Sequence, residues 1–203
     1  MELKILELSA SHAFGERAIN TMDSYISVID EYNFDSTDLS NYNVLLITYF
    51  TDQEYLYKHK HIIENFLNEG KVIVFCGHLF RKWLPGCSLF MPKKLNSYQD
   101  YFVKTIPGAP LFDSVEIEDM VCNKGVAGFF ARGYYHTPEN AEVCLTFTDG
   151  KVISYIDRHT TNGTIIVHGG QNLFSYATAT NTKKKIATQV LNLLKQEVSG
   201  GNK

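Results

Sequence analysis

Two short segments of the chain combine reactive side chains with glycine: Cys76-Gly77-His78 and His168-Gly169-Gly170-Gln171. A cysteine thiolate can attack a carbonyl carbon when a nearby imidazole accepts the thiol proton, so Cys76 and His168 are candidate catalytic residues. Glycine leaves room for a ligand to approach the backbone. These residue types therefore favour either nucleophilic attack by a thiol or the binding of a polar ligand.

Six further side chains are candidate ligand-binding residues, because they are predicted to lie near strand ends or in the loops beside them: His12, Asp52, His78, Arg81, Arg132 and Gln171. Imidazole, carboxylate and amide groups exchange hydrogen bonds with polar ligands, and a guanidinium holds a carboxylate or phosphate at two points. Alternatives stay open: Cys76 packs as a small hydrophobe, His168 bonds a backbone carbonyl in the core, and arginines form structural ion pairs. No metal-ligand spacing is present, so no metal site is expected.

The first half of the chain alternates predicted strands and helices. Apolar runs predict strands at residues 3–8, 25–29, 43–50 and 72–76, with a short helix at 16–22 and a longer one between residues 51 and 70. Thr51-Asp52-Gln53-Glu54 matches a helix capping box, and Gly70 suits the end of that helix. This alternation of strands and helices is typical of right-handed strand–helix–strand units with parallel strands. The carboxyl ends of such strands form a ligand-binding edge of the sheet.

The second half is less regular. Four of the five prolines lie in residues 79–123, which we interpret as an irregular excursion over the ligand-binding edge. Strands follow at 128–135, 142–147, 152–156 and 165–168, and the Asp149-Gly150 and Asn162-Gly163 turns indicate antiparallel hairpins. A final amphipathic helix is expected at 182–198. The fold class is therefore α/β: flavodoxin-like, three-layer α/β/α, with a mainly parallel sheet and late antiparallel hairpins.

Composition narrows the functional classes. The 203 residues are 44% hydrophobic, which fits one domain at residues 1–198 followed by a loose tail at 199–203. The net charge of −3 gives no general attraction for nucleic acid. No run approaches the roughly 20 apolar residues of a membrane span, and the start of the chain does not resemble a signal peptide. Four cysteines without a C-x-x-C pair suggest reduced thiols, so we expect a cytoplasmic protein.

Four stretches carry a resemblance to a known family: residues 41–47, 66–74, 108–115 and 141–167. They resemble the class I glutamine amidotransferase-like superfamily, especially its trehalose-utilisation-like branch without glutaminase activity. The resemblance implies a flavodoxin-like topology and a nucleophilic cysteine at the position of Cys76. His168 resembles the catalytic histidine of that family, but Gly169-Gly170 follows it where active glutaminases have Pro-Glu.

Three functional hypotheses follow. The first is a domain that binds a small polar ligand, sugar-like or nucleotide-like, without glutaminase activity and without a cofactor. The second is a hydrolase or amidotransferase in which Cys76 attacks and His168 acts as base. The third is a protein-interaction subunit, whose partner is either a second copy of the chain or another protein.

Overall fold

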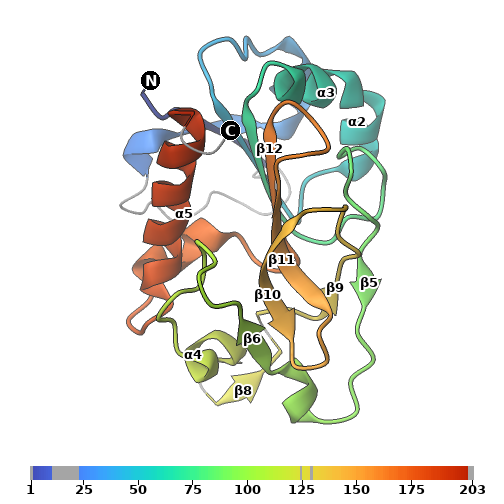
Figure 1. The fold of residues 1–203 in the computed structure, drawn as a ribbon. Coiled ribbons are helices and arrows are strands. Elements are labelled where there is room, and N and C mark those ends of the chain that lie inside the picture. The colour runs from blue at the N-terminus through green and yellow to red at the C-terminus, as the bar shows by residue number, and fades with distance from the viewer. Residues whose placement is uncertain (1, 11–22, 124, 129, 201–203) are drawn as a thin grey trace.

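The centre of the molecule is an eight-stranded sheet, seen here in a computed structural model that describes residues 2–10, 23–123, 125–128 and 130–200. The strands are β1 (Ile5–Ser9), β2 (Ile26–Asp30), β3 (Val44–Thr48), β4 (Val72–Cys76), β6 (Val103–Thr105), β10 (Glu142–Phe147), β11 (Val152–Asp157) and β12 (Thr164–His168). Their order is β2-β1-β3-β4-β12-β11-β10-β6 (Figure 1). The first five in this order are parallel. The last three run antiparallel to their neighbours, as the predicted hairpins require.

Helices cover both faces of the sheet. They are the α-helices α2 (Gln53–Lys58), α3 (Lys60–Asn68), α4 (Ile117–Val121) and α5 (Lys184–Val198), and the 3-10 helices η1 (Asp23–Tyr25), η2 (Glu31–Ser36), η3 (Tyr98–Tyr101) and η4 (Leu173–Thr178). Buried side chains of α4, α5 and η4 pack on one face, and those of α2, α3 and η2 pack on the other. The predicted three-layer α/β/α architecture with a mainly parallel sheet is confirmed.

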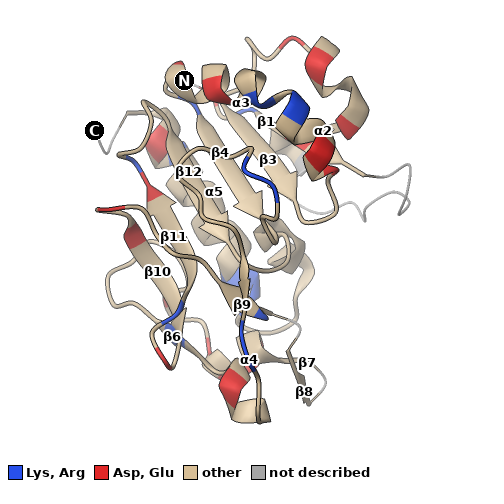
Figure 2. Cartoon of the chain, turned by 90° about the vertical axis from the view of Figure 1, so that its right-hand side faces the viewer, with Lys and Arg blue, Asp and Glu red and all other residues tan. Residues whose placement is uncertain are grey.

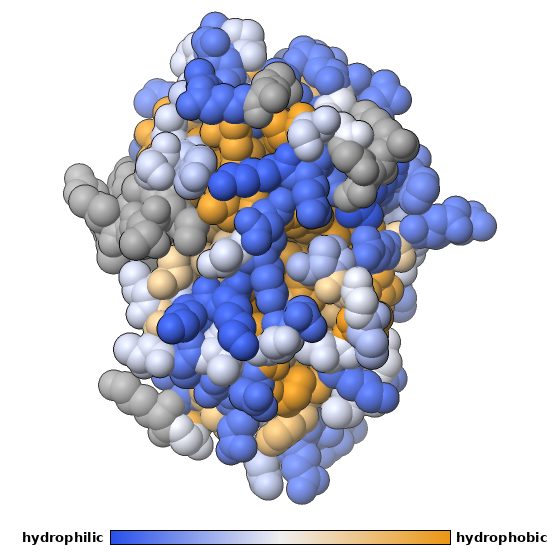
Figure 3. Space-filling view, turned by 60° about the vertical axis from the view of Figure 1, so that its left-hand side comes forward, coloured by the Kyte–Doolittle hydropathy of each residue, from blue (hydrophilic) through white to orange (hydrophobic). Residues whose placement is uncertain are grey.

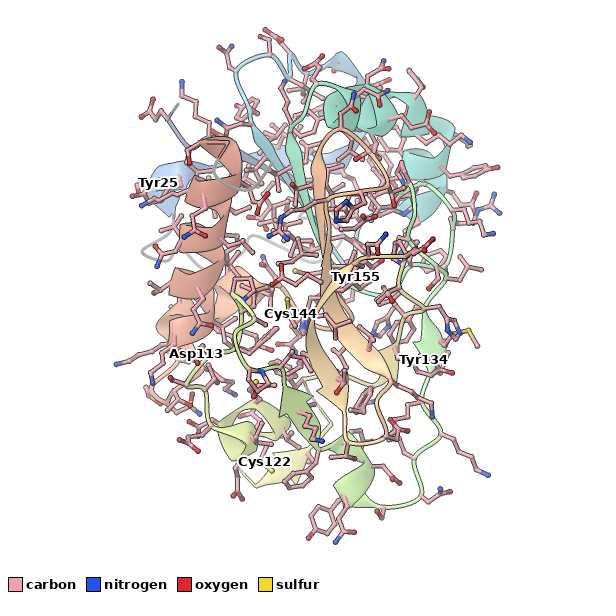
Figure 4. All side chains as sticks on the ribbon, viewed as in Figure 1. Tyr25, Asp113, Cys122, Tyr134, Cys144 and Tyr155 are labelled. Atoms are coloured by element: carbon pink, nitrogen blue, oxygen red, sulfur yellow. The ribbon has the colours of Figure 1, made fainter. Side chains whose placement is uncertain are left out.

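Because side chains alternate along each strand, the sheet contributes residues to the hydrophobic clusters on both of its faces. Successive side chains of a strand point to opposite faces. Accordingly Val74 and Cys76 pack on the α5 side, whereas Phe75 packs on the α3 side. Figure 4 shows the same division in the antiparallel part, where Cys144 faces α5 and Tyr155 lies on the other side. Because both faces are covered, the central strands are continuous apolar runs.

The three central parallel strands carry no charged side chain. Figure 2 shows positive and negative residues interspersed on helices and connecting segments, while β3, β4 and β12 carry no lysine, arginine or carboxylate. The helix predicted at residues 182–198 is confirmed by α5, which buries Ile186, Val190 and Leu194 against the sheet. Its outer side contributes to the hydrophilic band down the middle of Figure 3.

Some local predictions differ from the structure. The helix expected between residues 51 and 70 is split at His59, which ends α2 and precedes α3. Of the strand expected at 128–135, the described residues form only the short β9 (Gly133–Tyr134), which pairs with β5 (Met91–Pro92). Close packing of Gly133 against Phe90 and the Met91 carbonyl shapes this segment. The irregular excursion also supplies β6 and the short β7 (Cys122–Asn123), which pairs with β8 (Val126–Ala127). The helix predicted at 16–22 lies outside the described residues.

Asp52, and not Thr51, is the N-cap of α2. Its carboxylate accepts hydrogen bonds from the backbone N–H groups of Glu54 and Tyr55, at 2.9 and 3.1 Å. Asp52→Ala is expected to lower the free energy of unfolding by about 1 kcal/mol, because both amides lose their acceptor. Urea denaturation checks this, with Asp52→Asn as the control that keeps an acceptor oxygen. Equal losses in the two variants would contradict a capping role.

Candidate functional site

The strand register brings the two predicted catalytic residues to the same edge. β4 and β12 are adjacent parallel strands, and Cys76 is the register partner of His168. Thr48 on β3 lies beside Cys76 on the other side. These positions are the carboxyl ends of three parallel strands, where ligands bind in open α/β sheets. The two glycine-containing segments therefore meet at this edge.

Cys76 is closed to solvent at this edge. Its side chain is 0% exposed, and burial raises the pKa of its thiol to about 12. A thiol with such a pKa is protonated at neutral pH and supplies no thiolate nucleophile. Tyr135 fixes the backbone that follows, since its hydroxyl donates to the Gly77 carbonyl at 2.6 Å and accepts from the Leu79 amide at 3.0 Å. This environment favours packing over catalysis, and the catalytic role of Cys76 stays a prediction.

His168 is also buried. Its Nδ1 lies 2.6 Å from the Ser154 hydroxyl on β11, while its Nε2 has no hydrogen-bond partner among the described residues. Burial, reinforced by the nearby His78, lowers the pKa of the imidazole to about 3. The ring is therefore neutral at physiological pH. A base role for His168 stays a prediction as well, because the residue is buried and its Nε2 has no contact with solvent.

Thiol accessibility can be measured directly. Cys76, Cys87 and Cys144 are buried, whereas Cys122, at the end of α4, is partly exposed (Figure 4). We expect iodoacetamide at pH 8 to label Cys122 at least about tenfold faster than Cys76 in the folded protein, because burial raises the pKa of the Cys76 thiol. Peptide mapping by mass spectrometry, with urea-unfolded protein as the control, gives the rates. Rapid labelling of Cys76 in the native state would restore the nucleophile hypothesis.

A small open cavity lies beside the ends of β3, β4 and β12. Its volume is about 180 Å³. It is lined by Tyr49, His78, Gly128, Phe130, Ala131, Arg132, Gly169, Gly170 and Gln171. Three of the predicted ligand-binding residues, His78, Arg132 and Gln171, therefore share one cavity. The bridge between Ala131 and Gly170 joins the two loops that form much of its wall.

Two basic side chains define the electrostatics of the cavity. The Arg132 Nε donates to the Gly128 carbonyl at 2.7 Å, and no carboxylate of the described residues forms an ion pair with this guanidinium. The His78 ring stacks on Phe90, with ring centroids 3.9 Å apart. Desolvation, together with the charge of Arg132, lowers the pKa of His78. His78 is therefore neutral at pH 7, and Arg132 carries the positive charge.

The remaining predicted ligand-binding residues are placed elsewhere. Asp52 caps α2 and accepts a hydrogen bond from the Tyr32 hydroxyl at 3.0 Å. Arg81 pairs with Glu54 at 2.6 Å and lies over the Tyr57 ring. Neither lines the cavity, because each is engaged by neighbours around α2. His12 lies outside the described residues.

Sequence reasoning missed Tyr49 as a cavity residue. It directly follows β3, so its position at the carboxyl edge was available from the strand pattern. Its backbone packs so closely on Gly77 that a Cβ there would lie 2.7 Å from the Tyr49 Cα. Gly77 thus allows the loops after β3 and β4 to approach each other and to place Tyr49 at the cavity. Phe130 also lines the cavity and supplies an apolar surface there.

Other hollows lie away from this edge. One of about 850 Å³ includes Thr164, the first residue of β12, and therefore lies at the opposite edge of the sheet. Its polar walls are held by ion pairs of Arg158 with Glu142 and Glu197. Within the described part of the chain, no group of three or more histidine, cysteine or acidic residues is arranged to hold a metal ion. The same part contains no helix with the length and apolarity of a membrane span.

Comparison with known proteins gives a weak structural likeness. No protein-family model matches the chain, and no curated protein matches it. Among solved structures, the chain is similar to a glutamine amidotransferase from Thermotoga maritima, with 12% sequence identity and a TM-score of 0.45 over 98% of this chain and 91% of that chain. This identity and TM-score are too low to assign a family, an activity or the trehalose-utilisation-like branch to the chain.

Proposed function

We propose that this protein binds a small polar, sugar-like molecule in the cavity at the carboxyl edge of its sheet. The observation that carries the proposal is the meeting of His78, Arg132 and Gln171 around one cavity. Aromatic residues Tyr49 and Phe130 supply apolar walls beside these polar groups. A mostly apolar cavity with a few polar groups is the usual composition of a small-molecule site.

Cavity size favours the sugar-like ligand over the nucleotide-like one. The volume of the cavity is about 180 Å³. Drug-sized ligands occupy clefts of roughly 300–1,000 Å³. A single monosaccharide ring suits the smaller space, whereas a whole nucleotide would extend well beyond it.

A titration followed by NMR tests the binding proposal. Adding D-glucose, D-galactose or D-ribose is expected to shift protein resonances in a saturable way for at least one sugar. Tyr49→Ala should weaken that binding about tenfold, because the ring forms one wall of the cavity. Tyr98→Ala is the matched control, since Tyr98 is exposed and lies outside the cavity. Absence of any saturable shift, or equal weakening by both variants, would contradict the proposal.

We further propose that the chain lacks glutaminase activity. A protonated, buried Cys76 supports this proposal, and so does the Gly169-Gly170 pair after His168. We expect ammonia release from L-glutamine to equal that of a Cys76→Ala variant. An enzyme-coupled ammonia assay measures it. Release that depends on Cys76 would favour the alternative of a cysteine-dependent hydrolase or amidotransferase.

The interaction-subunit hypothesis has its own candidate surface in the irregular excursion. Phe80 and Tyr98 are 61% and 64% exposed there. A partner or a second copy of the chain would cover such side chains. Size-exclusion chromatography with light scattering over a range of protein concentrations distinguishes a homo-oligomer from a monomer.

A further inference from the structure

The arginines of the described residues differ in how their charge is balanced. Arg81 pairs with Glu54 at 2.6 Å, and Arg158 pairs with Glu142 and Glu197 at 2.7 and 2.8 Å. Arg132 is the exception in this part of the chain, because it forms no ion pair with a described carboxylate. Its charge is therefore available to a ligand.

The hydrogen bonding of Arg132 orients the guanidinium. The Nε donates to the Gly128 carbonyl, and both residues line the cavity. Neither Nη group donates to an acceptor among the described residues. An arginine held at Nε keeps the two-pronged donor pattern that matches a carboxylate or phosphate. The Arg132 side chain is thus already partly ordered in the free protein, so it loses less conformational entropy when the ligand binds.

The rest of the cavity does not offset this charge. No acidic side chain is among the described residues that line it. His78 stays neutral at pH 7, because desolvation and Arg132 lower its pKa. Gln171 and the glycine backbone are uncharged. The cavity therefore carries one uncompensated positive charge, which attracts an anion and repels a cation.

We infer that the ligand of this cavity is an acidic monosaccharide, a single sugar ring bearing a carboxylate or a phosphate that Arg132 holds at two points. The inference rests on the proposed sugar-binding function and adds the charge of the ligand to it. The volume of about 180 Å³ leaves room for one ring with one anionic group. Sugar acids and sugar phosphates share this chemistry, and the test below separates them.

The test is an NMR titration at low salt with D-glucuronate, D-glucose 6-phosphate, D-glucose and inorganic phosphate. At least one acidic sugar is expected to bind about tenfold or more tightly than D-glucose, the range of a charge-assisted hydrogen bond. Tighter binding of glucuronate than of glucose 6-phosphate assigns a carboxylate, and the reverse order assigns a phosphate. Raising the salt concentration should reduce the preference, because exposed charges are screened.

Amino-acid substitutions test whether Arg132 causes the preference for the acidic sugar. Arg132→Gln should reduce the preference for the acidic sugar to within about twofold, and Arg132→Lys should restore only part of it because lysine lacks the planar fork. Arg81→Gln should leave the preference unchanged, since Arg81 lies outside the cavity. Circular dichroism confirms that each variant is folded. If Arg132→Gln does not fold, the inference is tested by whether salt reduces the preference of the unmodified protein for the acidic sugar.

The outcomes separate the inference from the proposed function. Equal binding of D-glucose and both acidic sugars would overturn the role of Arg132 and leave sugar binding intact. If inorganic phosphate binds as tightly as glucose 6-phosphate and glucose does not bind, the claim that the ligand contains a sugar ring would be overturned. No binding of any of the four, together with no binding of D-galactose or D-ribose, would overturn both.

Discussion

Arg158→Ala is expected to lower the free energy of unfolding by about 2–3 kcal/mol. Arg158 follows β11, and its Nε and Nη2 donate to the Glu197 Oε1 of α5 at 2.9 and 2.8 Å. Its Nη1 donates to Glu142 on β10 at 2.7 Å. The Thr164 hydroxyl on β12 donates to the other Glu197 oxygen at 2.8 Å. One side chain thus ties helix α5 to strands of the antiparallel part of the sheet.

Burial makes this network costly to break. The Glu197 side chain is only 5% exposed, so removing Arg158 takes an ion pair and two hydrogen bonds away from a carboxylate that has little contact with water. Breaking a fully buried pair costs about 3–5 kcal/mol. The expected loss is smaller here because the Glu142 side chain is 39% exposed, so water solvates its carboxylate when Arg158 is removed.

Arg81→Ala is the matched control for this measurement. Arg81 and Glu54 form an equally short ion pair, but their side chains are 42% and 54% exposed. Such surface pairs contribute about 0–1 kcal/mol. Urea denaturation of both variants therefore compares the same chemistry in two environments. Equal losses would show that the burial of Glu197 does not set the strength of the Arg158 network.

These arginines also show what the sequence could and could not predict. Residue type alone indicated that an arginine such as Arg81 or Arg132 can bind an anion, either a ligand or a protein carboxylate. The partners Glu54 and Glu197 are 27 and 39 residues away in the sequence from Arg81 and Arg158, respectively. Only the folded chain decides which arginine is paired. Arg132 is left for the ligand because of tertiary structure, not because of a local pattern.

The fold was more accessible to sequence reasoning than the site. The buried runs of β4 and β12 are long, apolar and bounded by turns, so both their type and their bounds were predicted nearly to the residue. Two- and three-residue strands such as β6 have no periodicity to detect. The break at His59 also had no signal, because apolar residues continue on both sides of it.

The predicted catalytic pair shows the same limit at atomic scale. The strand pattern put Cys76 and His168 at the same edge of the sheet, and only the folded structure shows that they are register partners on adjacent strands. Whether these side chains open to solvent depends on Leu173, Phe130 and other residues of later segments that close over that face. Alternation in a strand assigns a side chain to a face of the sheet. It does not show whether another layer covers that face.

Burial of His168 leads to a second large effect, a loss of stability in mild acid. The pKa of its imidazole is about 3 in the folded protein, against an ordinary value of 6.5. As the pH falls below 6.5, the unfolded chain binds a proton at this residue and the folded protein does not. Stability therefore decreases with falling pH from about 6.5 down to about 3. Between pH 8 and pH 5 the expected loss is about 2 kcal/mol.

His168→Gln isolates this contribution from those of the other histidines. Glutamine keeps a group that can hydrogen-bond to Ser154 but does not titrate, so the variant should lose about 2 kcal/mol less than the unmodified protein between pH 8 and pH 5. Comparing the pH dependence in urea denaturation, not the absolute stability, removes any packing cost of the substitution. An NMR titration provides the direct test, since the His168 ring resonances should stay unchanged from pH 8 to pH 5. Titration of that ring near pH 6, or the same pH dependence in both proteins, would mean that water reaches the imidazole, and a base role for His168 beside the cavity would then regain support.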